Sequence, residues 1–280
     1  MIAFIGSVFS PYYAAARRRG MADPQNHVGI NAILYRPGGK KWAMTERGRR
    51  DLHRSARHLA IGPSSVRWCG DRLVIEIDER TVPLPRRLRG TVEVSTGPIF
   101  HETHRLDHAG RHRWRPVAPL ARVEARFEAP EVAFSGRAYV DMNAGDEPLE
   151  KGFSYWTWSR SALPGGGTAI FYDVEARDRP APAIANRYQL DGSVEPLPAP
   201  PARDLPGTLW RVRRSARSAS AVDAATVRTL EDTPFYTRSS FPAVIGGIPC
   251  PTICESVDLD RFAAPWVRLL LPFKMPRWPK

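Results

Sequence analysis

The scattering of proline along this chain limits the folds that it can adopt more than any other feature. Proline occurs 27 times in 280 residues, roughly twice its usual frequency. An internal proline removes a backbone donor and clashes with the preceding helical turn, so few long helices are possible. Only residues 48–59, Gly48 through Leu59, predict a helix of any length. The chain is therefore expected to form short strands joined by turns.

Apolar and charged residues alternate along several segments, which is typical of half-buried β-strands. The clearest cases are residues 122–128 and 73–78. Further strands are expected at 2–8, 28–36, 41–46, 88–95, 111–117, 132–141, 153–160, 168–176, 184–190, 207–215, 235–244, 252–258 and 266–272. Many short strands separated by Gly, Pro and Asp turns indicate an all-β barrel or sandwich with little helix.

Two turn-rich segments are candidate domain boundaries. Residues 142–148 are acidic and rich in turn formers, and residues 195–201 form a proline-rich loop. The first segment leaves about equal numbers of strands on either side. We therefore predict two antiparallel β-barrels packed together, one over residues 1–146 and one over residues 147–280, with the second segment a loop in the C-terminal barrel.

Positive charge is concentrated near the N-terminus. The formal net charge is +12, and residues 1–60 hold eleven Lys or Arg against three Asp or Glu. Such a patch suits nucleic acid or an anionic bilayer, because both present phosphate. Alternatively, the arginines reflect only a GC-rich genome. The aromatic residues form no recognisable nucleic-acid motif, so no nucleic-acid partner is expected.

Cysteine usage and the N-terminus bear on the compartment. Cys69, Cys250 and Cys254 form no disulfide framework and no paired C-x-x-C motif, which favours a reducing compartment. The apolar residues 1–9 precede the Arg17–Arg19 run instead of following it, unlike a signal peptide. No apolar stretch reaches about 18 residues, so membrane contact must be peripheral. We expect a cytoplasmic protein that associates with the membrane surface.

The familiar cofactor and nucleophile motifs are absent. The chain has no G-x-G-x-x-G, no G-x-x-x-x-G-K-[ST], no G-x-S-x-G and no H-E-x-x-H. Residues 165–167, Gly-Gly-Gly after Pro164, are expected to form a hairpin loop. No cofactor is predicted, and any catalysis must depend on ordinary acid–base side chains.

Four histidines lie within twelve residues, namely His101, His104, His108 and His112. Imidazole is a common metal ligand. However, the turn expected from Asp107 to Gly110 breaks any helix that would align these side chains. We therefore predict no metal site and expect most of these histidines to lie in solvated loops.

Two pairs of residues spaced by two are the best candidates for chemistry. A strand places His112 and Trp114 on one face, and a second strand does the same for Tyr139 and Asp141. Arg137 shares the second face. One strand, at 122–128, separates the pairs, so both can face one barrel interior. The alternative is that Trp114 and Tyr139 are core aromatics and Asp141 is a turn residue.

These residues also carry a family resemblance. The matching stretches are residues 4–13, Asp23-Pro24, Asn26-His27, 42–49, 85–90, 110–114, 138–150, Trp156, Trp158 and 159–160. On these stretches the chain resembles the carotenoid 1,2-hydratase (hydroxyneurosporene synthase) family of phototrophic bacteria, densely to about residue 215.

The resemblance implies a lipocalin-like fold and hydration of the terminal double bond of an acyclic carotene. The active-site set that it implies falls on His112, Trp114, Tyr139 and Asp141. We assign Trp156, Trp158 and Tyr13, aromatics within the matching stretches, to substrate binding. Residues 14–16, Ala-Ala-Ala, depart from the expected pattern, which weakens assignments of substrate contacts there.

The implied partners are an acyclic carotenoid, water and a membrane surface. Asp141 would need a pKa raised by roughly three units to remain protonated at pH 7, and Arg137 would oppose that rise. Trp114 and Tyr139 would face the developing cation, while His112 would orient Asp141 or accept a proton. The rival hypotheses are a non-catalytic isoprenoid carrier and a polyene isomerase or cyclase.

Overall fold

The computed structural model describes residues 1–277 and divides the chain into two compact units. Unit 1 comprises residues 1–96, 121–138 and 268–280, and unit 2 comprises residues 97–120 and 139–267. The segments of the two units alternate along the chain, so the division differs from the expected single boundary after residue 146.

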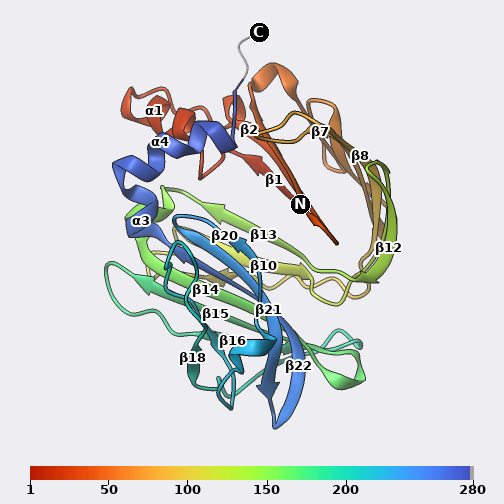
Figure 1. The fold of residues 1–280 in the computed structure, drawn as a ribbon, viewed down its shortest axis with the longest axis vertical. Helices are drawn as coiled ribbons and strands as arrows, with labels where there is room; N and C mark the ends of the chain where they lie inside the picture. Colours follow the sequence, from red (N-terminus) through yellow and green to blue (C-terminus); the bar gives the residue numbers. More distant parts are fainter. Residues whose placement is uncertain (278–280) are drawn as a thin grey trace. The chain divides into compact units, whose positions relative to one another are not determined.

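Unit 1 is built on two antiparallel sheets. A three-stranded sheet has the order β1-β2-β3, and a curved seven-stranded sheet has the order β12-β11-β8-β7-β6-β5-β4 (Figure 1). The strands are β1 Ile2–Ile5, β2 Val28–Arg36, β3 Gly39–Arg47, β4 Leu52–Arg54, β5 His58–Ile61, β6 Ser64–Cys69, β7 Arg72–Arg80, β8 Arg87–Ser95, β11 Arg122–Ala129 and β12 Glu131–Arg137. Helix α1 covers Pro11–Arg18, and 3-10 turns cover Pro24–Asn26 and Arg49–Asp51.

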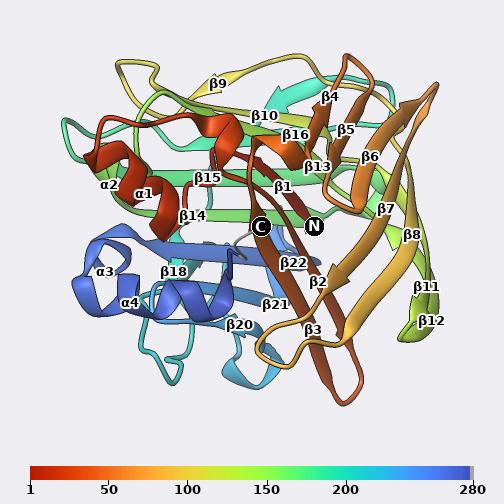
Figure 2. The same cartoon turned by 90° about the horizontal axis from the view of Figure 1, so that it is seen from above.

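Unit 2 contains the second seven-stranded sheet, with the order β17-β16-β15-β14-β22-β21-β20. Its other sheets are β13-β10-β9 and β18-β19 (Figure 2). The strands are β9 His104–Arg105, β10 His112–Ala118, β13 Val140–Gly145, β14 Phe153–Ala162, β15 Thr168–Ala176, β16 Ile184–Tyr188, β17 Val194–Pro196, β18 Ala202–Asp204, β19 Ser215–Arg217, β20 Arg228–Asp232, β21 Tyr236–Ile245 and β22 Ile248–Asp258. The helices are α2 Leu149–Gly152 and α3 Leu259–Ala263, with 3-10 turns at Pro164–Gly166 and Ala224–Thr226.

The predicted predominance of strands is confirmed, whereas closure into two barrels is not. Within residues 1–277, the first and last strands of each seven-stranded sheet are not hydrogen-bonded to each other as neighbours. The alternating segments at 73–78 and 122–128 lie within β7 and β11, and the glycines at 165–167 form the β14–β15 hairpin loop. In β7, Ile75 and Ile77 are buried as their alternation predicted.

Four local expectations were wrong. The segment 132–141 is not one strand, because β12 ends at Arg137 in unit 1 and β13 begins at Val140 in unit 2. Residues 48–59 form a 3-10 turn followed by β4 and the start of β5, because Leu52 pairs with Ile61 in a hairpin at the edge of the sheet. Residues 207–214 form no strand. The segment 266–272 lies in helix α4, Pro265–Lys274, in which Val267 and Leu271, four positions apart, are both buried. No helix within residues 1–277 combines the length and apolar character needed to cross a membrane.

Candidate active site

Strands β10 and β13 bring the candidate catalytic residues together within unit 2. They pair directly and antiparallel, with Trp114 opposite Asn143, and the register shifts between Arg115 and Ala118 (Figure 1). Asp141 lies near the start of β13, and Tyr139 immediately precedes that strand. The intervening β11 and β12 belong to unit 1. The two pairs of residues are therefore neighbours through direct strand pairing, and not through the intermediate strand that their spacing suggested.

The Asp141 carboxylate accepts two hydrogen bonds on the same oxygen. The Trp114 indole donates from Nε1 to Oδ2 over 2.9 Å, and the Tyr139 hydroxyl donates to Oδ2 over 3.3 Å. Trp114 is only 1% exposed, so its ring holds this donor in a fixed position. Asp141 itself is partly buried. Both donors therefore engage Oδ2, and neither of them engages Oδ1.

Burial controls the proton affinity of this carboxyl. The pKa of Asp141 is raised from 3.8 to about 6, chiefly by desolvation, and the nearby Glu255 carboxylate contributes to this rise. Hydrogen bonds from Trp114, Tyr139 and Asn143 lower the pKa and so limit the rise. With a pKa of about 6, roughly one carboxyl in ten is protonated at pH 7. The rise is smaller than the three units that the mechanism appeared to require, and the exposed Arg137 is not among its causes.

Aromatic rings from β14 and β15 surround this group. Strand alternation places Trp156 and Trp158 on one face of β14, and Trp158 lies opposite Tyr172 of β15. Ring centroids are 5.0 Å apart for Tyr139 and Trp158, and 5.4 Å apart for Trp114 and Tyr172. Trp156 lies 6.3 Å from Tyr172. Trp156 and Trp158, which were assigned to substrate binding, thus belong to an aromatic layer that also contains Trp114 and Tyr139, the two donors to Asp141.

Two polar features of this layer have mechanistic consequences. The Trp158 Nε1 donor is buried and has no hydrogen-bond partner among the described residues. Such a donor is costly unless a ligand or water meets it. The Arg160 guanidinium lies 5.5 Å above the Tyr139 ring, so one face of that ring already holds a cation.

Glu255 and Tyr172 belong to the site, although sequence reasoning did not identify them. Glu255 of β22 lies directly opposite Trp158, and Arg238 of β21 donates to its Oε1 over 2.9 Å. Burial and the charges of Asp141 and Glu255 raise the pKa of the Tyr172 hydroxyl, which therefore stays neutral. The sequence predicted a strand at 252–258, but only strand pairing reveals that Glu255 lies opposite Trp158.

His112 is held by a different carboxylate. Its Nδ1 lies 2.8 Å from Asp107 Oδ2, and Asp107 also accepts the His112 backbone N–H over 2.8 Å. The ring packs on Phe153 and so closely on Gly152 that a Cβ there would lie 2.6 Å from Cε1. Its Nε2 is buried without a hydrogen-bond partner in the described chain. The imidazole is thus oriented by Asp107, and its Nε2 remains available to a ligand or water.

The other three histidines of the cluster lie in different surroundings from His112. His101 and His108 are exposed, and His104 packs its ring 5.3 Å from Trp114. Gly110 donates its backbone N–H to Asp107, which closes the expected turn.

Tyr13 is located in unit 1. It is buried in α1, with its ring 4.9 Å from the His27 imidazole. His27 Nδ1 lies 2.7 Å from Glu46 Oε1, and Arg277 binds the same oxygen over 2.6 Å.

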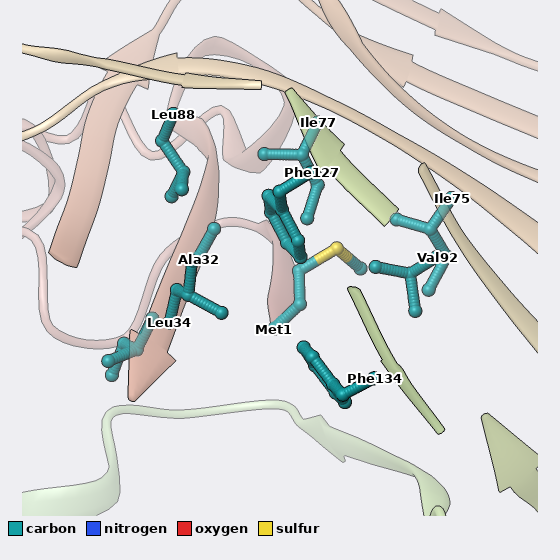
Figure 3. Close-up of a pocket in the computed structure, with 10 residues that line it drawn as sticks. Met1, Ala32, Leu34, Ile75, Ile77, Leu88, Val92, Phe127 and Phe134 are labelled. Carbon is teal, nitrogen blue, oxygen red and sulfur yellow. The ribbon is translucent and has the colours of Figure 1, made fainter. Parts of the chain in front are cut away.

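Unit 1 also contains an apolar cavity of about 150 Å³, shown in Figure 3. It is lined by Met1, Ala32, Ile33, Leu34, Ile75, Ile77, Leu88, Val92, Phe127 and Phe134. No titratable side chain lines it, so it offers no acid–base chemistry. A second hollow of about 960 Å³ in this unit is lined by arginines and carboxylates. Most of these arginines are paired, as Arg47 is with Glu79 and Arg87 with Asp78.

Comparison with known proteins identifies the family of this chain. An acyclic carotenoid 1,2-hydratase of Thiocapsa roseopersicina is 47% identical over 278 residues, covering 99% of this chain and 68% of that protein. Another, from Rubrivivax gelatinosus, is 46% identical with the same coverage. The crystal structure of a candidate AttH protein from Nitrosomonas europaea shares the fold, with a TM-score of 0.57 and 11% identity over 83% of this chain and 82% of that one. Residues 1–280 match the family described as carotenoid hydratase CrtC. The chain therefore belongs to the carotenoid hydratase CrtC family, as the resemblance implied, and is accordingly a hydro-lyase.

Proposed function

We propose that this chain adds water to the terminal C1=C2 double bond of acyclic carotenes such as neurosporene and lycopene, with Asp141 as the proton donor. The observation that carries the proposal is the Asp141 carboxyl, with its pKa raised to about 6, beside an aromatic layer. An alkene offers no heteroatom for a base or nucleophile to act on. Its hydration therefore begins with proton transfer to carbon, for which a carboxylic acid is suitable.

The hydrogen bonds to Asp141 determine which oxygen delivers the proton. Trp114 and Tyr139 both donate to Oδ2, so this oxygen serves as the carbonyl acceptor in the protonated acid. The acidic proton then resides on Oδ1. Transfer of that proton to C2 breaks the O–H bond and the π bond, and leaves a tertiary cation at C1.

The aromatic layer stabilises this cation. Trp158 is partly buried beside Tyr139, and a desolvated π face contributes about 1–2 kcal/mol to a cation that it faces. Because Arg160 already covers one face of Tyr139, we assign the larger share to Trp158. Trp114, with its ring buried, acts mainly as a hydrogen-bond donor to Asp141.

Water then completes the addition. The unpartnered Trp158 Nε1 is placed to hold the oxygen of a water molecule or of the product hydroxyl. The water oxygen bonds to C1, and the resulting oxonium returns one proton to the Asp141 carboxylate. The cycle restores the acid, consumes one water and requires side chains only. His112, oriented by Asp107, is a second candidate acceptor for that proton through Nε2.

The test is incubation of the purified chain with lycopene or neurosporene in liposomes made up in deuterated water enriched in oxygen-18. We expect products that gain one or two waters, with oxygen-18 in the hydroxyl at C1 and deuterium at C2. A new product that gains no oxygen, with or without deuterium on carbon, would instead indicate an isomerase or cyclase, and bound but unaltered carotene would indicate a carrier. Either result would contradict hydration of these substrates.

The rate should fall as the pH rises through the pKa of Asp141, because only the protonated carboxyl can donate. We expect kcat/KM to decline above about pH 6. In Glu255→Gln, loss of the neighbouring negative charge lowers the pKa of Asp141, so the decline begins at lower pH and the rate at pH 7 drops a few-fold.

Arg238→Gln is the matched control for this prediction. Removing the Arg238 guanidinium leaves the negative charge of Glu255 without that partner, which raises the pKa of Asp141. The fall in kcat/KM should therefore begin at higher pH. The two variants alter the same ion pair and must shift the pH profile in opposite directions. Shifts in the same direction would contradict electrostatic control of Asp141 by this pair.

A further inference from the structure

Helix α4 carries large apolar side chains on two faces, and one of these faces is open to solvent. Val267, Leu271 and Met275 recur four positions apart and are buried. The exposed face consists of four residues, Trp266 at 45%, Leu269 at 72%, Leu270 at 41% and Phe273 at 76% exposure. Their spacing of three, four and seven positions places them on a single helical stripe. We call these four residues the α4 stripe.

The α4 stripe differs from the scattered apolar residues found on most protein surfaces. Single exposed leucines are common, but a continuous exposed stripe of Trp, Leu and Phe marks a surface that another apolar phase covers. Within unit 2, Trp266 stacks on Trp210 with ring centroids 6.0 Å apart, and Leu209 beside it is 88% exposed. Trp266, the first residue of the stripe, therefore has a further exposed apolar neighbourhood within unit 2.

Basic side chains lie beside this stripe. Lys274, the last residue of α4, has its ammonium group 5.4 Å from the Trp42 ring, and Lys40 lies 6.0 Å from the same ring. Arg268 occupies the first turn of α4, and the helix itself contains no acidic residue. The chain as a whole carries a formal charge of +12. An apolar stripe with a Trp at one end and flanking cations is complementary to an anionic lipid surface.

We propose that α4 docks this protein on an anionic phospholipid bilayer, with the α4 stripe inserted among the acyl chains and Lys40 and Lys274 among the headgroups. This inference goes beyond the proposed hydration, because it concerns where the protein resides and can be tested without any carotene. Docking of this kind would bring the protein to the phase that dissolves a long isoprenoid substrate.

The experiment is vesicle flotation of the full chain, without carotene, on phosphatidylcholine vesicles with and without phosphatidylglycerol. We expect the wild type to float with the phosphatidylglycerol vesicles. The double variant Leu269→Glu with Phe273→Glu should bind at least tenfold more weakly, since both positions are exposed and the fold does not require them. Leu84→Glu with Leu190→Glu is the matched control, because these leucines are 66% and 60% exposed and the added charge is the same.

A second pair of substitutions separates the headgroup contribution. Lys40→Gln with Lys274→Gln should weaken binding several-fold on phosphatidylglycerol vesicles and leave binding to phosphatidylcholine alone unchanged. A wild type that stays in the buffer would overturn the proposal, as would equal binding by the stripe variant and its control. Sedimentation showing a dimer that the stripe variant converts to monomer would also overturn it, because a second copy would then cover the stripe.

Discussion

Asp141→Asn is expected to lower the rate of carotene hydration by about a thousandfold or more, with the fold retained. General acid catalysis contributes roughly 10²–10⁴-fold in enzymes, and an amide cannot donate a proton to carbon at neutral pH. The amide oxygen of the variant can still accept the hydrogen bonds from Trp114 and Tyr139 that now reach Oδ2. The substitution therefore removes the acidic proton and changes little else.

The measurement is product formation from neurosporene in liposomes, followed by mass, with bound carotene quantified separately by its absorbance. Asp146→Asn is the control, because Asp146 lies near the end of the same stretch and forms an exposed ion pair with Arg113. We expect that variant to retain the wild-type rate. Carotene should bind to Asp141→Asn as it does to the wild type. A rate within tenfold of the wild type in Asp141→Asn would show that another group delivers the proton.

Period-two alternation was sufficient to predict most of the strands. In β7 and β14, one face is buried and the other meets solvent or a second layer, so the sequence must alternate. The strand predicted at 266–272 was wrong, because these residues are apolar at nearly every position and show no alternation. A continuous apolar run of this kind fits either a strand or a helix, and its periodicity cannot distinguish the two.

The division into units could not be predicted from turn-rich segments. The chain leaves unit 2 after Leu120, forms the β11–β12 hairpin in unit 1 and returns to unit 2 at Tyr139, so a single boundary cannot describe it. The loop-rich residues 142–148 that suggested a boundary include the end of β13, which pairs with β10 through Gly145 opposite His112. Turn-forming residues mark local chain geometry, whereas compact units depend on which distant strands pair.

Part of the candidate site was predictable from the same period-two geometry of strands. The spacing of Trp114 and of Tyr139 and Asp141 fixed which side chains share a strand face. It could not reveal that His112 is oriented by Asp107, or that Glu255 lies across from Trp158. Asp107 lies in a turn, and Glu255 lies in a strand more than one hundred residues from Asp141, so both partners are determined by tertiary structure.

The raised pKa of Asp141 also predicts a pH-dependent stability difference between the wild type and Asp141→Asn. The ordinary pKa of 3.8 applies to the unfolded chain, whereas the folded protein holds the proton up to about pH 6. Between these values the folded state binds more protons than the unfolded state, so the stability of the wild type falls as the pH rises. The contribution of the protonated carboxyl is complete below about pH 4 and lost above about pH 6.

The size of this change follows from the shift. A rise from 3.8 to about 6 corresponds to about 3 kcal/mol at most, and we expect about 2 kcal/mol because the residue is partly exposed. The Asn side chain does not titrate, so the free energy of unfolding of Asp141→Asn should gain this amount relative to the wild type between pH 4 and pH 7. Urea unfolding of both proteins across this range measures the difference.

Asp146→Asn again supplies the control, with the opposite sign. The Arg113 guanidinium lowers the pKa of Asp146, so the ion pair stabilises the wild type at neutral pH and is lost as the pH falls. Asp146→Asn should therefore lose stability relative to the wild type at neutral pH, whereas Asp141→Asn gains it. A constant difference between Asp141→Asn and the wild type at all pH values would mean that Asp141 titrates at its ordinary pKa. The carboxyl would then be almost fully ionised at pH 7, and protonation of a carotene by Asp141 would lose its physical basis.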